Sequence, residues 1–220
     1  MYKNKKILAL ITARKNSVRL KKKNFMIISK QPLIYWTINS ALQSKFLDSI
    51  YLSSDMSEIL RYTKKFKRVK TLKRKRSLSL SNTSSYAVIN DFLKKHKNYD
   101  YFCLLQPTSP LRTKTDIDNS IKMIVNRKSK SLISISKLKN GNFKTYLNHK
   151  GFLSNKLKNN KKYYINGAVY ISKIEKKKII KNFMTAKTLG YIMPKSRSID
   201  IDNLKDFKKA EKYIKNKNII

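Results

Sequence analysis

Short apolar runs alternate with amphipathic segments along most of this chain. Runs of strand length bounded by polar loops predict β-strands at residues 7–12, 49–55, 68–72, 101–105, 131–136 and 166–172. Apolar residues at helical spacing predict helices after Pro32, over residues 56–66 and 85–97, after Thr113, near 173–182 and over 204–215. This alternation predicts an α/β fold with a mainly parallel sheet and helices on both faces.

The alternation is interrupted at one place. Residues 137–165 have no clear period, and we expect a small insertion of hairpin-like or irregular structure there. Residues 1–136 and 166–220 then form one domain. A chain of 220 residues is long enough to bury a single core of that size.

The charge of the chain is unusually positive. It has 52 Lys and Arg against 12 Asp and Glu, a formal net charge of +40, which predicts nonspecific attraction to polyanions at low salt. The basic residues are spread over the whole chain, and no nucleic-acid-binding motif accompanies them, so we expect no specific nucleic-acid partner. A hydrophobic fraction of 40% excludes global disorder.

Cysteine, histidine and apolar run lengths exclude several classes of protein. Cys103 is the only cysteine, which leaves no intrachain disulfide, predicts a buried thiol and suits a reducing cytoplasm. His96 and His149 have no Cys or His neighbours at ligand spacing, which argues against zinc. No apolar run approaches the ~20 residues that span a bilayer, so we expect no membrane insertion.

The strongest candidate for chemistry is the loop after the first strand. The apolar run at 7–12 leads directly into a polar segment, and six of the ten residues from Arg14 to Lys23 are Arg or Lys. In an open α/β sheet, ligands bind where strands end, because the following loop supplies N–H groups and cations. A nucleoside triphosphate fits this loop, although a merely basic surface loop is the alternative.

Three later segments add polar groups at comparable places. Residues 74–85 form a basic, hydroxyl-rich loop before a helix, where Ser84 or Ser85 is either a phosphate contact or the helix N-cap. Gln106 ends the most apolar strand, and its amide suits a pyrimidine edge or sugar hydroxyls. Asp55 ends another strand and either caps the next helix or contacts a ligand.

Two aspartates near the carboxyl end of the chain are candidate metal ligands. Asp200 and Asp202 are two residues apart, so both carboxylates point the same way in an extended segment. Such a pair favours Mg²⁺ bridged to phosphate oxygens. The alternative is a solvated acidic turn that caps the last helix.

These segments occur in an order that is similar to one known family. The ordered motifs are ARxNS with KN (Arg14, Asn16, Ser17, Lys23, Asn24), RxxxL (Arg74, Leu78), QPTSPLR at 106–112, NGAVYI at 166–171 and DID at 200–202. Together they closely resemble the N-acylneuraminate cytidylyltransferases, over nearly the whole chain.

The resemblance implies a Rossmann-like nucleotide-diphospho-sugar transferase fold and a homodimer whose insertion reaches into the partner's site. It implies a nucleotidyltransferase that joins CTP to a nine-carbon 2-keto sugar acid, giving the CMP-sugar and pyrophosphate. The anomeric hydroxyl would attack the α-phosphorus in line, with Mg²⁺ and cationic side chains stabilising the leaving group.

The resemblance also assigns roles to matching positions. The nucleotide would be held by Arg14, Ser17, Lys23, Asn24, Arg74, Ser85 and Gln106. The sugar acid would be bound by Gln106, Lys144, Lys156, Tyr170 and Phe183. Catalysis would rest on Arg14, Lys23, Asp200 and Asp202, with the two aspartates as metal ligands.

The chain departs from the family pattern in two places. Val18 and Arg19 follow ARxNS where Lys and Gly are common, and Lys156 and Tyr164 stand where the insertion of the family has two arginines. Lysine cannot reproduce the bidentate arginine grip on a carboxylate. N-acetylneuraminate is the expected sugar; legionaminic or pseudaminic acid, and a degenerate, non-catalytic basic binding protein, are the alternatives.

Overall fold

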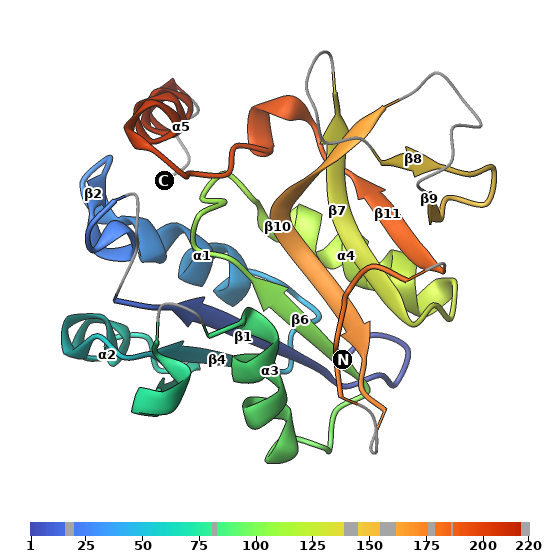
Figure 1. Ribbon diagram of the computed structural model, residues 1–220, viewed down its shortest axis with the longest axis horizontal. Coiled ribbons are helices and arrows are strands. Elements are labelled where there is room, and N and C mark those ends of the chain that lie inside the picture. Colours follow the sequence, from blue (N-terminus) through green and yellow to red (C-terminus); the bar gives the residue numbers. More distant parts are fainter. Residues whose placement is uncertain are drawn as a thin grey trace.

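A seven-stranded sheet forms the centre of the computed structural model, which describes residues 1–15, 20–80, 83–138, 145–154, 162–175, 179–185 and 187–216 (Figure 1). Its strands are β1 (Ile7–Ala13), β4 (Ser49–Ser54), β5 (Val69–Lys73), β6 (Tyr101–Leu105), β7 (Ser131–Lys137), β10 (Tyr163–Lys173) and β11 (Thr188–Ile192). Their order is β11-β7-β10-β6-β1-β4-β5. Only β10, in the described sheet, runs antiparallel to its neighbours β6 and β7, so the predicted mainly parallel sheet is confirmed.

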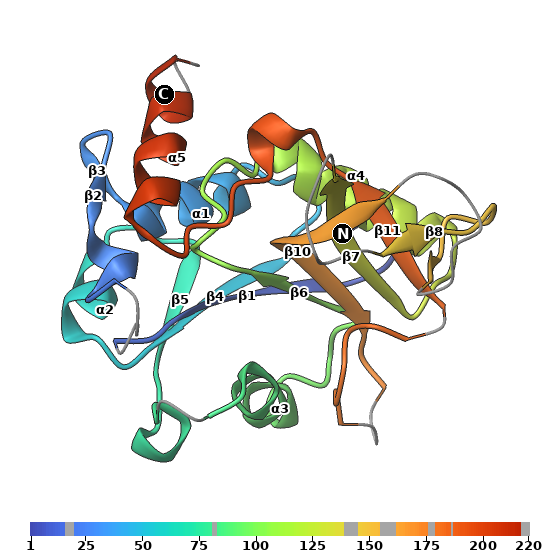
Figure 2. The same ribbon diagram turned by 45° about the horizontal axis from the view of Figure 1, so that its top comes forward.

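Helices cover both faces of the sheet, as the sequence predicts. They are α1 (Leu33–Leu42), α2 (Ser57–Thr63), α3 (Ser85–Lys94), α4 (Lys114–Asn126) and α5 (Leu204–Asn216). Figure 2 shows α1 and α4 on one side of the sheet and α3 on the other. Alternate residues of β1 point to opposite faces: Ile7 and Ile11 pack in the core with α1 and α4, whereas Leu10 packs in the core with α3.

The last helix packs away from the sheet. Its apolar face, Phe207, Ala210 and Ile214, shares a third core with Ile28 and Trp36. Ile28 belongs to a short hairpin, β2 (Ile27–Ile28) and β3 (Gln31–Pro32), which follows the 3₁₀ turn η1 (Lys23–Phe25). This packing holds the start of α5 beside the loop that follows β1.

The described part of the predicted insertion forms a small hairpin of β8 (Tyr146–Leu147) and β9 (Leu153–Ser154). It lies against β11, where the Gly190 N–H donates to the carbonyl of Gly151 at 3.1 Å. A Cβ on Gly190 would lie 2.5 Å from Leu147 Cδ2, so a larger residue there would force the Leu147 side chain to shift. Residues 163–165, placed in the insertion by the sequence, pair with β7.

One predicted helix is wrong. Residue 173 ends β10, and the described residues 174–175 and 179–182 form no helix. Instead, Asn90 on α3 holds the segment: its Oδ1 accepts from the Ile180 N–H and its Nδ2 donates to the Ile180 carbonyl, both at 2.9 Å. Tertiary contacts therefore override the local propensity for a helix.

Cys103 lies in the middle of β6 and is completely buried. Burial raises the pKa of its thiol to about 12, although the nearby Arg112 guanidinium opposes the shift. The predicted buried thiol is confirmed. The thiolate, which is the reactive form, is therefore scarce at neutral pH.

Candidate functional site

A cleft of about 530 Å³ opens where β1 and β6 end. Its walls come from the loops after β1, β5 and β6, the start of α3 and the segment before α5, and they include Thr12, Arg14, Lys23, Asn24, Arg74, Ser84, Ser85, Gln106, Thr108, Asp200 and Asp202. Eight of the sequence-predicted site residues therefore meet in one cavity. Ser17, Lys144 and Lys156 lie outside the described residues.

The loop after β1 is held in place by the side chains of Asn24 and Asp55. Asn24 Nδ2 donates to the Arg14 carbonyl at 3.2 Å, and Asp55 Oδ1 accepts from the Lys15 N–H at 2.8 Å. Helix α2 begins after Met56 without a side-chain cap. Of the two roles left open for Asp55, helix capping is wrong, since Asp55 supports the loop that follows β1.

Arg74 forms a buried cationic wall of the cleft. It is 8% exposed, and its guanidinium donates to the Ser53 carbonyl at 3.0 Å and to Ser53 Oγ at 3.4 Å. Burial lowers the pKa of Arg74, Asp55 raises it, and the positive charge of Arg14 lowers it further. Two arginines that repel one another across a cleft favour an anion between them.

At the start of α3, the structure shows which of two serines caps the helix. Ser84 is the N-cap, and its hydroxyl accepts from the Ala87 N–H at 3.2 Å. Ser85, the first helical residue, is exposed on the cleft wall. Of the two serines that the sequence left open, Ser84 is the cap.

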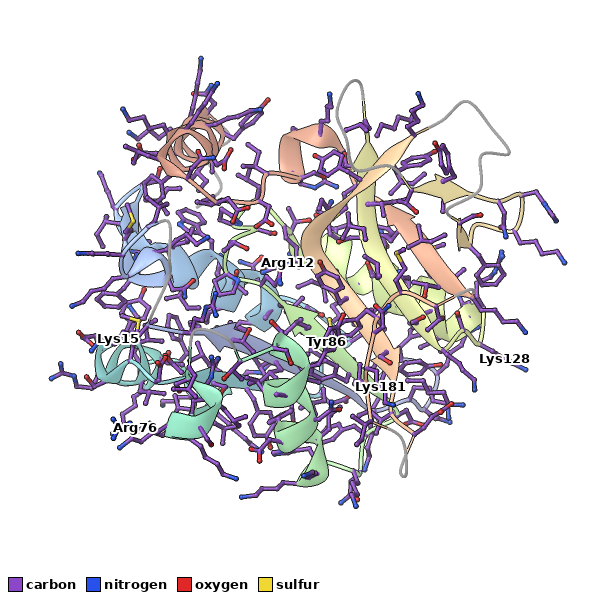
Figure 3. All side chains as sticks on the ribbon, in the orientation of Figure 1. Lys15, Arg76, Tyr86, Arg112, Lys128 and Lys181 are labelled. Carbon is purple, nitrogen blue, oxygen red and sulfur yellow. The ribbon has the colours of Figure 1, made fainter. Side chains whose placement is uncertain are left out.

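Gln106 is fixed from behind by an arginine that sequence reasoning did not single out. Arg112 Nη1 donates to the carbonyls of Gln106 and Ala168, at 3.2 and 2.8 Å, and thereby ties the end of β6 to β10. Arg112 is 2% exposed, and burial lowers its pKa to about 10. Figure 3 shows it at the centre of the molecule. Its only sequence signal is its place in QPTSPLR.

Asp200 and Asp202 lie at the end of the cleft nearest Lys23. Lys23 Nζ donates to the Ile201 carbonyl and lies 3.7 Å from Asp202 Oδ1. Asp200 faces the solvent of the open cleft, yet the surrounding protein desolvates it, and this burial raises its pKa. The charge of Asp202 adds to the increase, whereas the Thr108 hydroxyl and Lys23 oppose it.

Asn203 and Asp206 make reciprocal hydrogen bonds at the start of the last helix. Asp206 Oδ2 accepts from the N–H groups of Asp202 and Asn203, and Asn203 Oδ1 accepts from the Asp206 N–H at 3.0 Å. Asn203 and Asp206 therefore satisfy these N–H groups around the start of the helix. Among the described residues, no three or more His, Cys, Asp or Glu gather as metal ligands. Two carboxylates fit Mg²⁺, which commonly takes one or two from the protein and the rest from phosphate and water.

The two aromatic residues assigned to the sugar lie beside the cleft rather than in its wall. Phe183 is 4% exposed, with ring centroids 5.1 Å from Tyr170 and 5.6 Å from Tyr86. Burial raises the pKa of Tyr170, and the charge of Asp200 raises it further, so this cluster borders the carboxylates. Tyr86, labelled at the start of α3 in Figure 3, was not singled out from the sequence.

Tyr164 stands at one of the two positions where the resemblance predicts an arginine. Its hydroxyl donates to the carbonyl of Ser198, two residues before Asp200, at 3.2 Å. Tyr164 therefore anchors the carboxylate segment.

No described helix is long and apolar enough to cross a membrane.

Comparison with solved structures identifies the fold. A CMP-2-keto-3-deoxy-manno-octonic acid synthetase complexed with CTP superposes with a TM-score of 0.76 at 13% identity, covering 96% of this chain and 99% of the other. A 4-diphosphocytidyl-2C-methyl-D-erythritol synthase from Anaerococcus prevotii gives 0.69 at 15% identity, covering 96% of each chain. These likenesses confirm the predicted fold class, a mixed α/β fold with a mainly parallel central sheet and helices.

Sequence comparison identifies the family. An N-acylneuraminate cytidylyltransferase from Streptococcus agalactiae serotype III is 32% identical over 214 residues, which are 92% of this chain and 52% of the relative. A pseudaminic acid cytidylyltransferase from Campylobacter jejuni is 27% identical over 224 residues, 94% of this chain and 95% of the relative. The chain spans about half the length of the first relative. The profile of the family described as Cytidylyltransferase matches residues 8–219, and the chain therefore belongs to the cytidylyltransferase family.

Proposed function

We propose that this protein transfers a cytidylyl group from CTP to a nine-carbon 2-keto sugar acid, N-acetylneuraminate in the first place, and releases pyrophosphate. One observation carries the proposal: three cations, Arg14, Lys23 and Arg74, share one cleft with two carboxylates, Asp200 and Asp202. This combination suits a triphosphate together with the cation that accompanies it. Family membership supports the same reaction.

Different residues of the cleft bind the triphosphate and orient the base or the sugar. Arg14 and Arg74 neutralise the triphosphate, and Ser85 at the start of α3 adds a hydroxyl and the positive end of the helix. Gln106 orients the base or the sugar through its amide, because its backbone is held by Arg112. The anomeric hydroxyl of the sugar attacks the α-phosphorus in line, the bond to pyrophosphate breaks, and the proton of the hydroxyl passes to solvent or a nearby base.

Mg²⁺ would be held by Asp200 and Asp202 together with phosphate oxygens. When bound, it stabilises the negative charge that develops on the leaving pyrophosphate. The Lys23 ammonium lies 3.7 Å from Asp202 Oδ1 and lowers the pKa of Asp200, against the larger opposite effect of burial.

A specific observation favours a second sugar. The pseudaminic acid enzyme of C. jejuni is matched over 95% of its length, whereas the neuraminate relative is matched over 52%. The same reaction on pseudaminic acid is therefore the second candidate. We further propose a cytoplasmic location, which the single cysteine suits, and a role in surface glycan biosynthesis. Sedimentation velocity tests the homodimer that the resemblance implies.

The decisive experiment measures pyrophosphate release with CTP and Mg²⁺. N-acetylneuraminic, legionaminic, pseudaminic and eight-carbon Kdo acids are offered in parallel, with UTP replacing CTP as a control. We expect turnover with a nine-carbon acid and CTP. The alternative of a non-catalytic basic binding protein would be supported if no pyrophosphate were released with any of the four acids. The protein would also have to be folded and bind RNA with a steep salt dependence.

A pair of variants tests the carboxylate assignment. Asp202→Ala should reduce product formation by about 10²-fold or more, because it removes one of two charged oxygen ligands. Asp91→Asn is the matched control, since Asp91 pairs with Lys75 at 3.0 Å on the surface and does not line the cleft. Normal activity of Asp202→Ala would remove Asp202 from the metal site.

A further inference from the structure

Asn166 lies behind the cleft at an irregularity of β10. The pairing of β10 with β7 shifts register between Ile165 and Tyr170. Asn166 is completely buried there and is not part of the cleft wall. A buried amide must be hydrogen-bonded, so its partners show which parts of the molecule it joins.

The side chain of Asn166 joins two serines from other elements. Its Oδ1 accepts from Ser134 Oγ of β7 at 2.6 Å, and its Nδ2 donates to Ser198 Oγ at 2.9 Å. Ser134 Oγ in turn accepts from the Val169 N–H at 2.8 Å, and Ser198 Oγ donates to the Pro194 carbonyl at 2.8 Å. Each hydroxyl donates once and accepts once, so the hydrogen bonds form one consistent chain.

The backbone beside Asn166 lies close to two side chains of the cleft, Gln106 and Asp200. Gly167 has φ of +74°, and a Cβ there would lie 2.9 Å from Gln106 Oε1 and 3.1 Å from Asp200 Oδ2. Asn166 Oδ1 also accepts from the Ala168 N–H at 3.2 Å, and the Asn166 carbonyl accepts from Ser109 Oγ at 3.3 Å. The amide thus fixes the irregular stretch of β10 that lies close to Gln106 and Asp200.

Ser198 extends this control to the carboxylates. It stands two residues before Asp200, and its Oγ is held by Asn166. From Asp200 onward the segment has contacts of its own, since the Ile201 N–H donates to the Thr108 carbonyl at 2.8 Å. The position of Asp200 is therefore set between a buried amide on one side and the turn after β6 on the other.

We propose that Asn166 is a positioning residue that sets the distance between Asp200 and Gln106, and thereby the strength with which the cleft holds a divalent cation together with CTP. The inference rests on the proposed function for its ligand, although it concerns binding and not turnover. Partners of metal ligands commonly change metal affinity by about 10–100-fold when removed, because they orient the ligand.

The test measures CTP binding by calorimetry in the presence of Mn²⁺ and again in EDTA. The ratio of the two affinities is the coupling between the cation and the nucleotide. We expect Asn166→Ala to reduce this ratio about tenfold or more, while CTP affinity in EDTA stays within about twofold. A merely structural loss would weaken both measurements together.

Asn90→Ala provides the matched control. Asn90 also makes two side-chain hydrogen bonds to a backbone segment, at 2.9 Å each, but it does not line the cleft. We expect both variants to lose thermal stability, and only Asn166→Ala to lose coupling. Ser198→Ala removes the acceptor of the Asn166 amide and provides the test if Asn166→Ala does not fold; it should reduce the coupling in the same direction.

The outcomes separate the inference from the proposed function. An unchanged coupling ratio in Asn166→Ala, or in Ser198→Ala, overturns the inference. The double variant Asn166→Ala/Ser198→Ala gives a further test. If its coupling ratio falls by the product of the two single reductions, the inference is also overturned, because residues of one network should not act independently. Reduced coupling without turnover by the wild type supports the inference and overturns the proposed reaction. A wild type with no coupling overturns both.

Discussion

Replacing Gly167 by alanine tests how closely the backbone approaches the site. Its φ of +74° lies in the left-handed region, where an alanine costs about 1–2 kcal/mol. The new Cβ would also lie 2.9 Å from Gln106 Oε1 and 3.1 Å from Asp200 Oδ2. Both contacts are with the ends of side chains, which move more easily than backbone. We therefore expect the fold to survive and the site geometry to change.

Gly151 offers a matched comparison, because its φ is +77° and a Cβ there meets nothing within 4 Å. Urea unfolding should show similar losses of about 1–2 kcal/mol for Gly151→Ala and Gly167→Ala. Pyrophosphate release should fall about 10²-fold only in Gly167→Ala, because a misplacement near 1 Å has such effects. Equal activity of the two variants would refute the reasoning, as would a much larger stability loss in Gly167→Ala.

Two further predictions concern carboxylates, two of them away from the cleft and one in its wall. Buried Asp116 accepts from Arg197 Nη2 at 2.8 Å and from Nε at 2.9 Å, so Asp116→Asn should lower the free energy of unfolding by about 3 kcal/mol, measured with urea. Glu58→Gln removes the surface partner of Lys22 and should lower the free energy of unfolding far less, and equal losses would contradict the argument. Burial raises the pKa of Asp200 in the folded protein, so stability falls as pH rises through that pKa, and Asp200→Asn should stabilise the metal-free protein at neutral pH. A gain that does not shrink on acidification through the raised pKa would be contrary to this prediction.

The strands were predictable where the apolar pattern alone decides them. Residues 101–105 form a continuous apolar run, and β6 has those bounds. The direction of β10 was not predictable, because pairing is decided by which neighbours are available after the chain folds. The prediction of a helix near 173–182 is wrong for the same reason. The side-chain amide of Asn90, far away in sequence, makes hydrogen bonds to the backbone N–H and carbonyl of Ile180.

The site was predictable as far as strand ends identify it. Arg14 and Gln106 stand just after buried strands, and parallel strands bring such residues to one edge. The buried supports were not predictable, because nothing in the local pattern shows that Arg112 holds the Gln106 carbonyl or that Asn166 links two serines. Asp206 accepts from the N–H groups of Asp202 and Asn203, just before α5, and this required the folded geometry.

The burial of Cys103 makes this protein convenient for spectroscopy. Its thiol is inaccessible, its pKa is raised to about 12, and the sequence has no other cysteine. A maleimide dye added to the folded wild type should therefore find no target. A cysteine introduced at Leu80, which lines the cleft and is 54% exposed, would be the single labelling position. Fluorescence from that dye would report nucleotide binding without a background from the native thiol.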